Sequence, residues 1–181
     1  MTAETAMGTR VAAVGAGRMG RGIALAFAYG GCEVDLVDLK ARPSKDWQRL
    51  AAEALEDMAS SLSMLAELGA FPQDAVARLM GRIHLHPESA SEEKLAGADV
   101  IFEGVTETLA AKKDAFGKIC RSARPDAILA STTSTILVTD LIPFVTHPER
   151  LLNAHWLNPA YVIPLVEMSV HPGTSPGVTG R

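Results

Sequence analysis

The chain has 181 residues, of which 48% are hydrophobic and 21% charged, and its formal net charge is −4 at pH 7. This composition indicates a globular domain with a real core and excludes a disordered chain. The net charge predicts neither a nucleic-acid nor a membrane partner, and no apolar run has the length of a transmembrane helix. The N-terminus lacks a signal-peptide pattern. Cys32 and Cys120 have no metal spacing, which predicts two buried thiols in a reducing cytoplasm.

After an expected disordered lead-in at residues 1–9, the first element is a short apolar run at residues 11–14, which predicts a buried strand. Three glycines follow at G-x-G-x-x-G spacing and open an apolar helix. In this fingerprint the first glycine permits a tight turn, the second lets a pyrophosphate approach the backbone, and the third allows close helix–strand packing. The helix N-terminus favours phosphate. The predicted cofactor-binding residues at this turn are Gly15, Gly17, Arg18, Met19 and Gly20.

The second predicted strand, at residues 33–38, ends in Asp38, eighteen positions past the last glycine of the fingerprint. An acid at this place accepts hydrogen bonds from the adenosine ribose hydroxyls and favours NAD over NADP. Lys40 and Arg42 lie nearby and soften that preference, so strict selectivity stays open. The simpler interpretation is a strand–helix turn without a ligand, with Asp38 as a surface residue.

A helical insertion is predicted at about 46–81, where a plain dinucleotide fold has a short crossover. Apolar residues keep a helical period through residues 46–68, and a second helix is expected from Pro72 to a stop at Gly81, giving an antiparallel pair. A strand at residues 83–86 follows. Its two histidines stand at H-x-H spacing without a third ligand, so no metal site is predicted.

The rest of the chain alternates strands and helices. Strands are expected at residues 98–105, 127–130, 151–156 and 165–169, and helices at 107–124 and 137–145. This alternation predicts an α/β domain of the Rossmann type, with a doubly wound, mostly parallel sheet. Ligands in such folds bind beyond the carboxyl ends of the strands, where polar residues follow strands four, five and six. His155 with a later carboxylate, Glu167, is the residue pair typical of a general base.

These motifs together resemble the N-terminal NAD-binding domain of the 3-hydroxyacyl-CoA dehydrogenase family. The matching stretches are V-G-A-G-R-M-G-R-G-I-A, A-D-V-I-F-E-G-V-T-E, S-T-T-S, H-W-L-N-P and P-L-V-E, and the resemblance covers nearly the whole chain. It implies NAD as the cofactor of an oxidoreductase of fatty acid metabolism. The expected reaction is oxidation of the 3-hydroxyl of an L-3-hydroxyacyl-CoA, such as 3-hydroxybutyryl-CoA, to the 3-keto product.

The resemblance also implies roles for individual residues. The catalytic set is His155 as base, Glu167 as its orienting carboxylate and Ser134 as the group that bonds the substrate oxygen, with Asn158 beside the substrate and Glu107 and Lys112 near the nicotinamide ribose. Plainer interpretations stay open for four of them. They are a core histidine at 155, a helix cap at 134, a helix-start acid at 107 and a solvated helix charge at 112.

Three departures from the family pattern bear on the substrate. Thr132 stands where the family usually has Asn, and Trp156-Leu157 replaces a pair of Phe residues. The third is the first inserted helix, residues 46–68, which carries one Arg and five acidic residues and is a poor surface for CoA phosphates. This favours the branch that oxidises free 3-hydroxy acids, which includes L-gulonate 3-dehydrogenase and λ-crystallin. The alternatives are therefore a free 3-hydroxy acid dehydrogenase, a non-catalytic NAD-binding structural protein, or an NAD enzyme of the 6-phosphogluconate type.

The resembled family continues into an all-helical C-terminal domain that forms a homodimer and completes the substrate site. This chain stops before it. Residues 10–181 are therefore expected to be an NAD-binding domain that binds cofactor but has little activity alone, with a homodimer expected through the missing domain.

Overall fold

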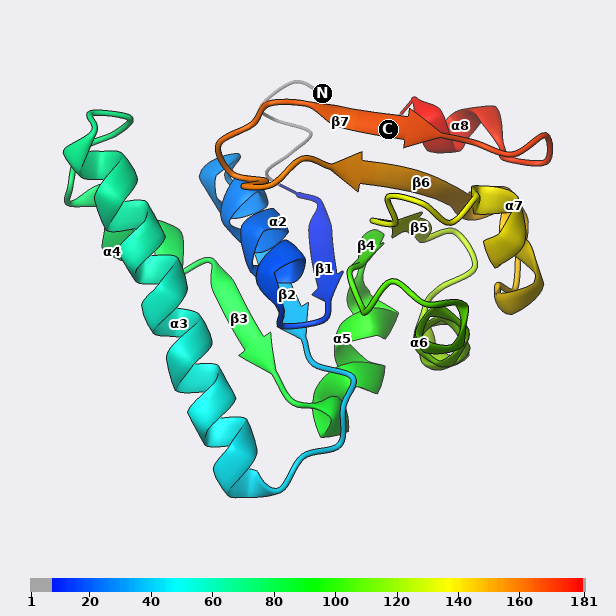
Figure 1. Ribbon diagram of the computed structural model, residues 1–181, viewed down its shortest axis with the longest axis horizontal. Coiled ribbons are helices and arrows are strands. Elements are labelled where there is room, and N and C mark those ends of the chain that lie inside the picture. The colour runs from blue at the N-terminus through cyan, green and yellow to red at the C-terminus, as the bar shows by residue number, and fades with distance from the viewer. Residues whose placement is uncertain (1–7, 181) are drawn as a thin grey trace.

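The computed structural model describes residues 8–180 and contains, within that range, one seven-stranded sheet (Figure 1). Its strand order is β3-β2-β1-β4-β5-β6-β7. The strands are β1 (Arg10–Val14), β2 (Glu33–Val37), β3 (Ile83–His86), β4 (Val100–Glu103), β5 (Ile128–Ser131), β6 (Leu151–Trp156) and β7 (Val166–Ser169). The first six strands pair in parallel, and β7 alone pairs antiparallel, with β6. The predicted doubly wound, mostly parallel sheet is confirmed.

Helices cover both faces of this sheet because successive side chains of a strand point to opposite faces. The helices are α2 (Arg18–Tyr29), α3 (Ser44–Glu67), α4 (Ala75–Met80), α5 (Ser91–Gly97), α6 (Leu109–Ser122), α7 (Val138–Leu141) and α8 (Pro176–Thr179), with short 3-10 turns η1 (Glu88–Ala90), η2 (Ile142–Phe144) and η3 (Pro148–Arg150). On β1, Val11 and Ala13 join the core under α2 and α3, whereas Ala12 and Val14 join the core under α5, α6 and α7. The run of small apolar residues in β1 is thus buried on both sides.

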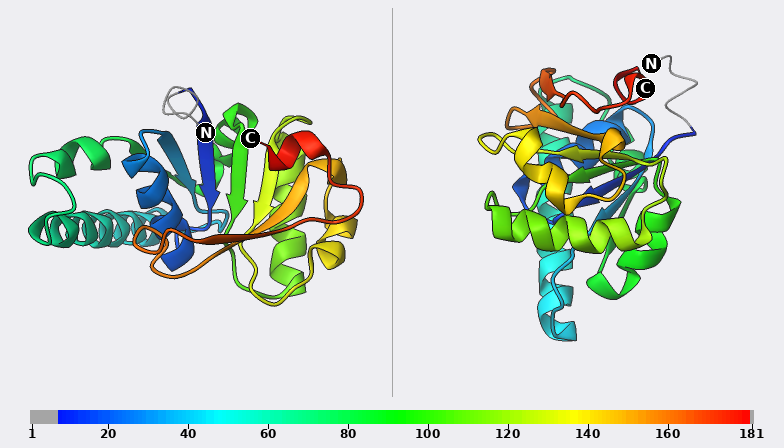
Figure 2. Two further views of the ribbon diagram at one scale, coloured as in Figure 1. Left: turned by 90° about the horizontal axis from the view of Figure 1, so that it is seen from above. Right: turned by 90° about the vertical axis from the view of Figure 1, so that its right-hand side faces the viewer.

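The inserted helical pair is present, and its second helix begins later than predicted. Helix α3 begins at Ser44, and the chain reverses at Gly69, whose φ is +84°. Helix α4 begins at Ala75 rather than Pro72, because the Pro72 carbonyl accepts a hydrogen bond from the Ala75 N–H in a preceding turn. Gly81 ends α4 as predicted. In both views of Figure 2, α3 extends well past the strands.

The apolar stripe of α3 packs only in part. Ala54, Met58 and Leu62 are buried, whereas Met64 and Leu68 near its end are exposed. No helix within residues 8–180 is both long and apolar enough to cross a membrane. The predicted lead-in at residues 1–9 falls outside the described residues except for Gly8 and Thr9, and the domain boundaries stay predictions.

Candidate active site

The turn from β1 to α2 is built by the three glycines of the fingerprint. Gly15 has a φ of +98°, and a Cβ on it would lie 2.8 Å from the Gly104 carbonyl oxygen. A Cβ on Gly20 would lie 1.9 Å from the Gly15 carbonyl oxygen, so the helix can approach the turn only with glycine there. Gly17 has no heavy atom within 4 Å of its Cβ position, which leaves its backbone open to a ligand.

The first turn of α2 is suited to an anion. Gly17 is its N-cap residue, no side chain caps the helix, and the first turn holds no acid. The first N–H groups of the helix therefore have no partner from a capping side chain and face the cavity with the positive end of the helix dipole. This geometry fits the pyrophosphate of a dinucleotide.

Asp38 follows the end of β2 and lines the same cavity as Gly15 and Gly17. Its carboxylate is 4% exposed and already has two partners in the chain. Arg42 donates from Nε to Oδ2 over 2.5 Å, and the Lys40 N–H donates to Oδ1 over 3.2 Å. The acid thus stands where an adenosine ribose would be expected, with a guanidinium bound beside it.

A second cleft lies beyond the carboxyl ends of β4, β5 and β6. Residues from four separate segments line it, namely Arg18, Met19, Gly104, Val105, Glu107, Lys112, Thr132, Thr133, Ser134, His155, Trp156, Leu157 and Asn158. The fold therefore gathers the nicotinamide-side and substrate-side residues singled out in the sequence into one cleft. The first cavity and this cleft share Gly104 and Val105, so they adjoin along the sheet edge.

His155 and Glu167 face one another across the antiparallel pair at the sheet edge. They are direct cross-strand partners of β6 and β7, so their side chains lie on the same face. His155 Nδ1 is 2.7 Å from Glu167 Oε2. Nε2 of the ring has no hydrogen-bond partner among residues 8–180, and His155 lines the cleft. A carboxylate that accepts from Nδ1–H leaves the Nε2 lone pair free to take a proton.

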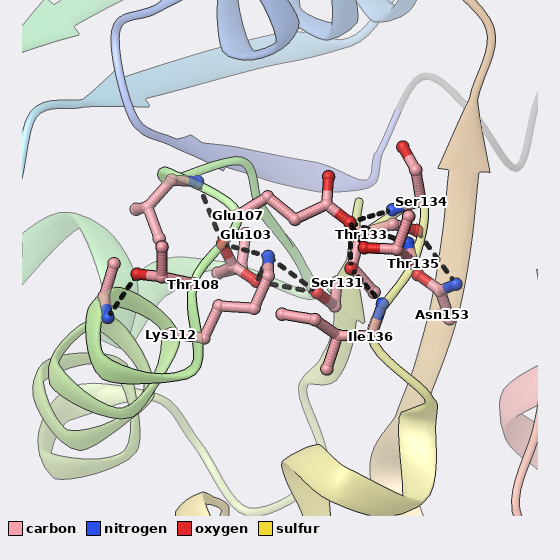
Figure 3. Close-up of polar contacts among 12 residues, drawn as sticks. Glu103, Glu107, Thr108, Lys112, Ser131, Thr133, Ser134, Thr135, Ile136 and Asn153 are labelled. Atoms are coloured by element: carbon pink, nitrogen blue, oxygen red, sulfur yellow. Dashed lines mark hydrogen bonds and ion pairs between the residues drawn. The ribbon is translucent and has the colours of Figure 1, made fainter.

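Glu107 binds the loop that follows β5 (Figure 3). Its Oε1 accepts four hydrogen bonds, from Thr133 Oγ1, Ser134 N, Thr135 N and Thr135 Oγ1, over 2.7–2.9 Å. Burial opposes ionisation, but the hydrogen bonds from Thr133, Thr135 and Ser134 outweigh it and lower the pKa of Glu107 to about 2. Oε2 has no hydrogen-bond partner within the described chain, so one oxygen is anchored and the other is available.

The helix boundaries argue against Ser134 as a helix cap and against Glu107 as the first residue of a helix. Helix α7 begins at Val138 with Leu137 as its N-cap, so Ser134 does not cap it. Helix α6 begins at Leu109, and Thr108 Oγ1 caps it by accepting from Ala111 N over 3.2 Å. The predicted start of this helix at Glu107 is therefore wrong by two residues, because Thr108 is the better cap. Glu107 lies before the helix and turns to the neighbouring loop instead.

The interpretation of Lys112 as a solvated helix charge is also wrong. Lys112 is 1% exposed, and its Nζ lies 2.8 Å from Glu103 Oε2 and 3.3 Å from Ser131 Oγ. Glu103 is fully buried at the end of β4 and also accepts from the Val105 N–H over 2.9 Å. The ammonium is thus held within the protein at the floor of the cleft, and a direct contact of Lys112 with cofactor stays a prediction.

The sequence missed the partners that hold these groups in place. The sequence pattern marks Arg42 only as a nearby charge and does not mark Asn153, a polar residue in a buried strand. Cys32 is buried as predicted, but Cys120, also predicted buried, is only half-buried. His84 and His86 pair with Glu33 and Asp35 on β2, and no cluster of three metal-binding side chains occurs within residues 8–180.

A glycine turn opening a helix, an acid at the end of β2, and a second cleft at the same edge of the sheet define the class of dinucleotide-binding α/β domains. A family model described as "3-hydroxyacyl-CoA dehydrogenase, NAD binding domain" matches residues 10–181. The chain belongs to this family as its NAD-binding domain, which confirms the predicted cofactor.

Three relatives illustrate the range of the family. An L-carnitine dehydrogenase/betainyl-CoA thioesterase of a Rhizobium species is 35% identical over 160 residues, which is 88% of this chain and 30% of the relative. A rat lambda-crystallin homolog is 31% identical over 94% of this chain and 51% of its own length. The crystal structure of (S)-3-hydroxybutyryl-CoA dehydrogenase from Ralstonia eutropha superposes with a TM-score of 0.82 at 30% identity, covering 94% of this chain and 57% of that one. The chain thus spans about half the length of such relatives, or less.

Proposed function

We propose that this chain provides the cofactor site and the acid–base pair of an NAD-dependent dehydrogenase that oxidises the 3-hydroxyl of an L-3-hydroxyacyl-CoA, such as 3-hydroxybutyryl-CoA. The observation that carries the proposal is the His155–Glu167 pair, which opens onto the cleft that also contains Ser134 and Glu107. A histidine whose second nitrogen has no partner in the described chain, in a cleft next to a dinucleotide turn, can take the hydroxyl proton when an alcohol is oxidised.

The residues of the chain divide the binding of NAD between the two adjoining cavities. The glycine turn would hold the pyrophosphate and Asp38 the adenosine ribose. Glu107 Oε2, the oxygen without a partner, would accept from the nicotinamide ribose. When bound, NAD⁺ supplies the acceptor for the hydride that leaves the substrate carbon.

His155 is proposed to transfer the proton of the substrate hydroxyl. Its Nε2 accepts the proton of the substrate hydroxyl, while Glu167 holds Nδ1–H and stabilises the imidazolium that forms. The Ser134 hydroxyl is exposed in the same cleft and bonds the substrate oxygen. In the reverse direction the protonated His155 returns the proton to the reduced ketone.

A free 3-hydroxy acid is the second candidate substrate, and the charge of α3 favours it. With Lys45 included, α3 carries two basic and five acidic residues. Arg49 is already engaged, with Glu53 at 3.4 Å and Asp46 at 3.9 Å. This helix therefore offers little positive charge to bind the phosphates of CoA. L-carnitine, the substrate named for one relative, is itself a free 3-hydroxy acid.

The deciding experiment compares 3-hydroxybutyryl-CoA, 3-hydroxybutyrate, L-carnitine and L-gulonate by NADH formation, with the chain in excess over substrate so that slow turnover is also seen. We expect the CoA thioester to react fastest. A preference for any free acid by more than about tenfold, or about 1.4 kcal/mol of transition-state binding, overturns the thioester assignment.

The cytoplasmic location and the homodimer stay proposals as well. We expect the homodimer to form through the helical domain that the resembled family carries. A stable dimer of this chain in analytical ultracentrifugation would contradict that expectation.

A further inference from the structure

The loop that carries Ser134 is held through its backbone, because the N–H groups of Ser134 and Thr135 donate to Glu107 Oε1. Ser134 and Thr135 are both exposed, and the Ser134 hydroxyl has no hydrogen-bond partner among residues 8–180. The position of this hydroxyl must therefore be set by what holds the backbone on either side of it. Thr133, the residue just before it, is only 1% exposed and has polar partners on three sides.

The Thr133 side chain forms one hydrogen bond to Glu107 and one within its own loop, to Ile136. Its Oγ1 donates to Glu107 Oε1 over 2.7 Å and accepts from the Ile136 N–H over 3.0 Å. The buried hydroxyl is thus used as both donor and acceptor, which is how a buried threonine is fully satisfied. Figure 3 shows the two contacts converging on Thr133 from the Glu107 side and from the turn at Ile136.

The Thr133 backbone ties the loop to the strand of the catalytic histidine. Asn153, in β6, donates from Nδ2 to the Thr133 carbonyl oxygen over 3.1 Å. Asn153 stands two positions before His155, so both side chains point to the same face of the strand. Thr133, the residue beside Ser134, thus contacts both Glu107 and β6, the strand that carries His155.

We propose that Thr133 and Asn153 are positioning residues that fix the Ser134 hydroxyl relative to His155 Nε2. The proposal rests on the function proposed above, in which these two groups act on one substrate oxygen. Neither side chain needs to touch substrate: Thr133 and Asn153 are 1% and 8% exposed. Because a reacting group displaced by about 1 Å slows a reaction by about a hundredfold, loss of either anchor is expected to lower the rate more than the cofactor affinity.

The variants that test Thr133 are Thr133→Val, which keeps the shape and removes the hydroxyl, and Thr133→Ser, which keeps the hydroxyl. With the chain in excess and NAD saturating, we expect Thr133→Val to slow NADH formation by about tenfold to a hundredfold. Thr133→Ser should stay within about threefold of the parent, and the NADH dissociation constant should change by less than about twofold in both. Thr179→Val makes the same change at an exposed position in α8 and is the matched control.

Asn153→Leu tests the second anchor in a variant that should still fold. Asn153 Oδ1 is buried without a hydrogen-bond partner among residues 8–180, so an apolar side chain of similar volume loses the bond to the Thr133 carbonyl and none at Oδ1. We expect a rate loss in the same range as for Thr133→Val. Combining the two changes should cost less than the product of the single effects, because both release the same loop.

Amide hydrogen exchange gives a readout that needs no turnover. The Ser134 and Thr135 amides donate to Glu107, and Thr133→Val should speed their exchange by about tenfold or more, whereas Thr133→Ser should not. Unchanged exchange and an unchanged rate in Thr133→Val overturn the inference, provided that Ser134→Ala slows the reaction. If Ser134→Ala leaves the rate unchanged, the proposed role of Ser134 fails instead, and the exchange data alone decide whether Thr133 anchors the loop.

Discussion

His155 and Glu167 stand 2.7 Å apart across β6 and β7, although eleven residues separate them along the chain. The contact exists because the chain leaves β6, turns, and returns antiparallel in β7, which makes the two residues direct cross-strand partners. This is also the one antiparallel pairing in the described sheet, at its edge. In the proposed reaction, a carboxylate in this position would orient the imidazole without contacting the substrate.

The first prediction concerns the role of this pair in the proposed oxidation. His155→Ala removes the proton acceptor and should lower kcat by about 10²–10⁴. Glu167→Gln keeps a partner for the ring but loses the charge, so its loss should be smaller. NADH affinity should barely change in either variant. Steady-state kinetics check this, with His147→Ala, an exposed histidine paired with Glu149, as the control. Equal losses in the two variants would contradict the assigned division of roles.

The second prediction concerns Asp38 and the adenosine ribose. Asp38→Ala should weaken NADH binding by about tenfold to a hundredfold, since hydrogen bonds to a charged group contribute about 1.5–3 kcal/mol. Isothermal titration calorimetry measures this directly on the 181-residue chain. Asp46→Ala makes the same charge change on exposed α3 and should leave binding unchanged. Unaltered affinity in Asp38→Ala would remove this residue from the cofactor site.

The third prediction concerns the effect of the Arg42 charge on the preference for NADH over NADPH. Because Arg42 binds the Asp38 carboxylate, it partly offsets the repulsion of a 2′-phosphate by that acid. Arg42→Ala should therefore raise the preference for NADH over NADPH by about twofold to fivefold, the effect of one partly exposed charge. Arg49→Ala, a cation further along the chain, is the control. A preference that falls in Arg42→Ala would mean that the guanidinium contacts NADH itself.

The fourth prediction is a pH dependence that follows from Glu107. Its pKa lies at about 2 in the folded chain against an ordinary value of 4.5, so the ionised carboxylate stabilises the fold above about pH 4.5. That contribution is lost as the pH falls toward 2. Glu107→Gln should therefore be less stable than the parent at pH 7, by about 1 kcal/mol after allowance for solvent screening, and the difference should shrink in acid. Urea unfolding at several pH values tests this. A difference that grows in acid would refute it.

The fifth prediction uses two adjacent lysines. Lys112→Met leaves the buried Glu103 carboxylate without its cation and should lower the free energy of unfolding by about 3–5 kcal/mol. Lys113→Met, at an exposed position, should change it by less than about 0.5 kcal/mol. Chemical denaturation compares the two. If the Lys112 variant is as stable as its neighbour and instead binds NADH more weakly, the lysine acts on the cofactor and not on the fold.

Local patterns in the sequence were enough to predict the parallel sheet and the glycine turn with the acid after β2. Strand, glycine turn, helix, second strand and terminal acid follow one another within forty residues, and each has a fixed spacing because one backbone geometry requires it. The alternation of strands and helices likewise predicted the parallel sheet. The twelve-position offset from His155 to Glu167 predicted a pair but not how the two residues meet.

Only the tertiary structure decided how side chains from distant segments are used. Lys112 has the sequence surroundings of a surface helix residue, yet it is buried because Glu103, nine residues earlier, ends a central strand beneath it. Glu107 has the place of a helix-start acid, yet four donors from the loop after β5 fold back onto one of its oxygens. These contacts depend on which strands are neighbours in the sheet and on their register. A sequence pattern does not record either, because both follow from packing the whole core at once.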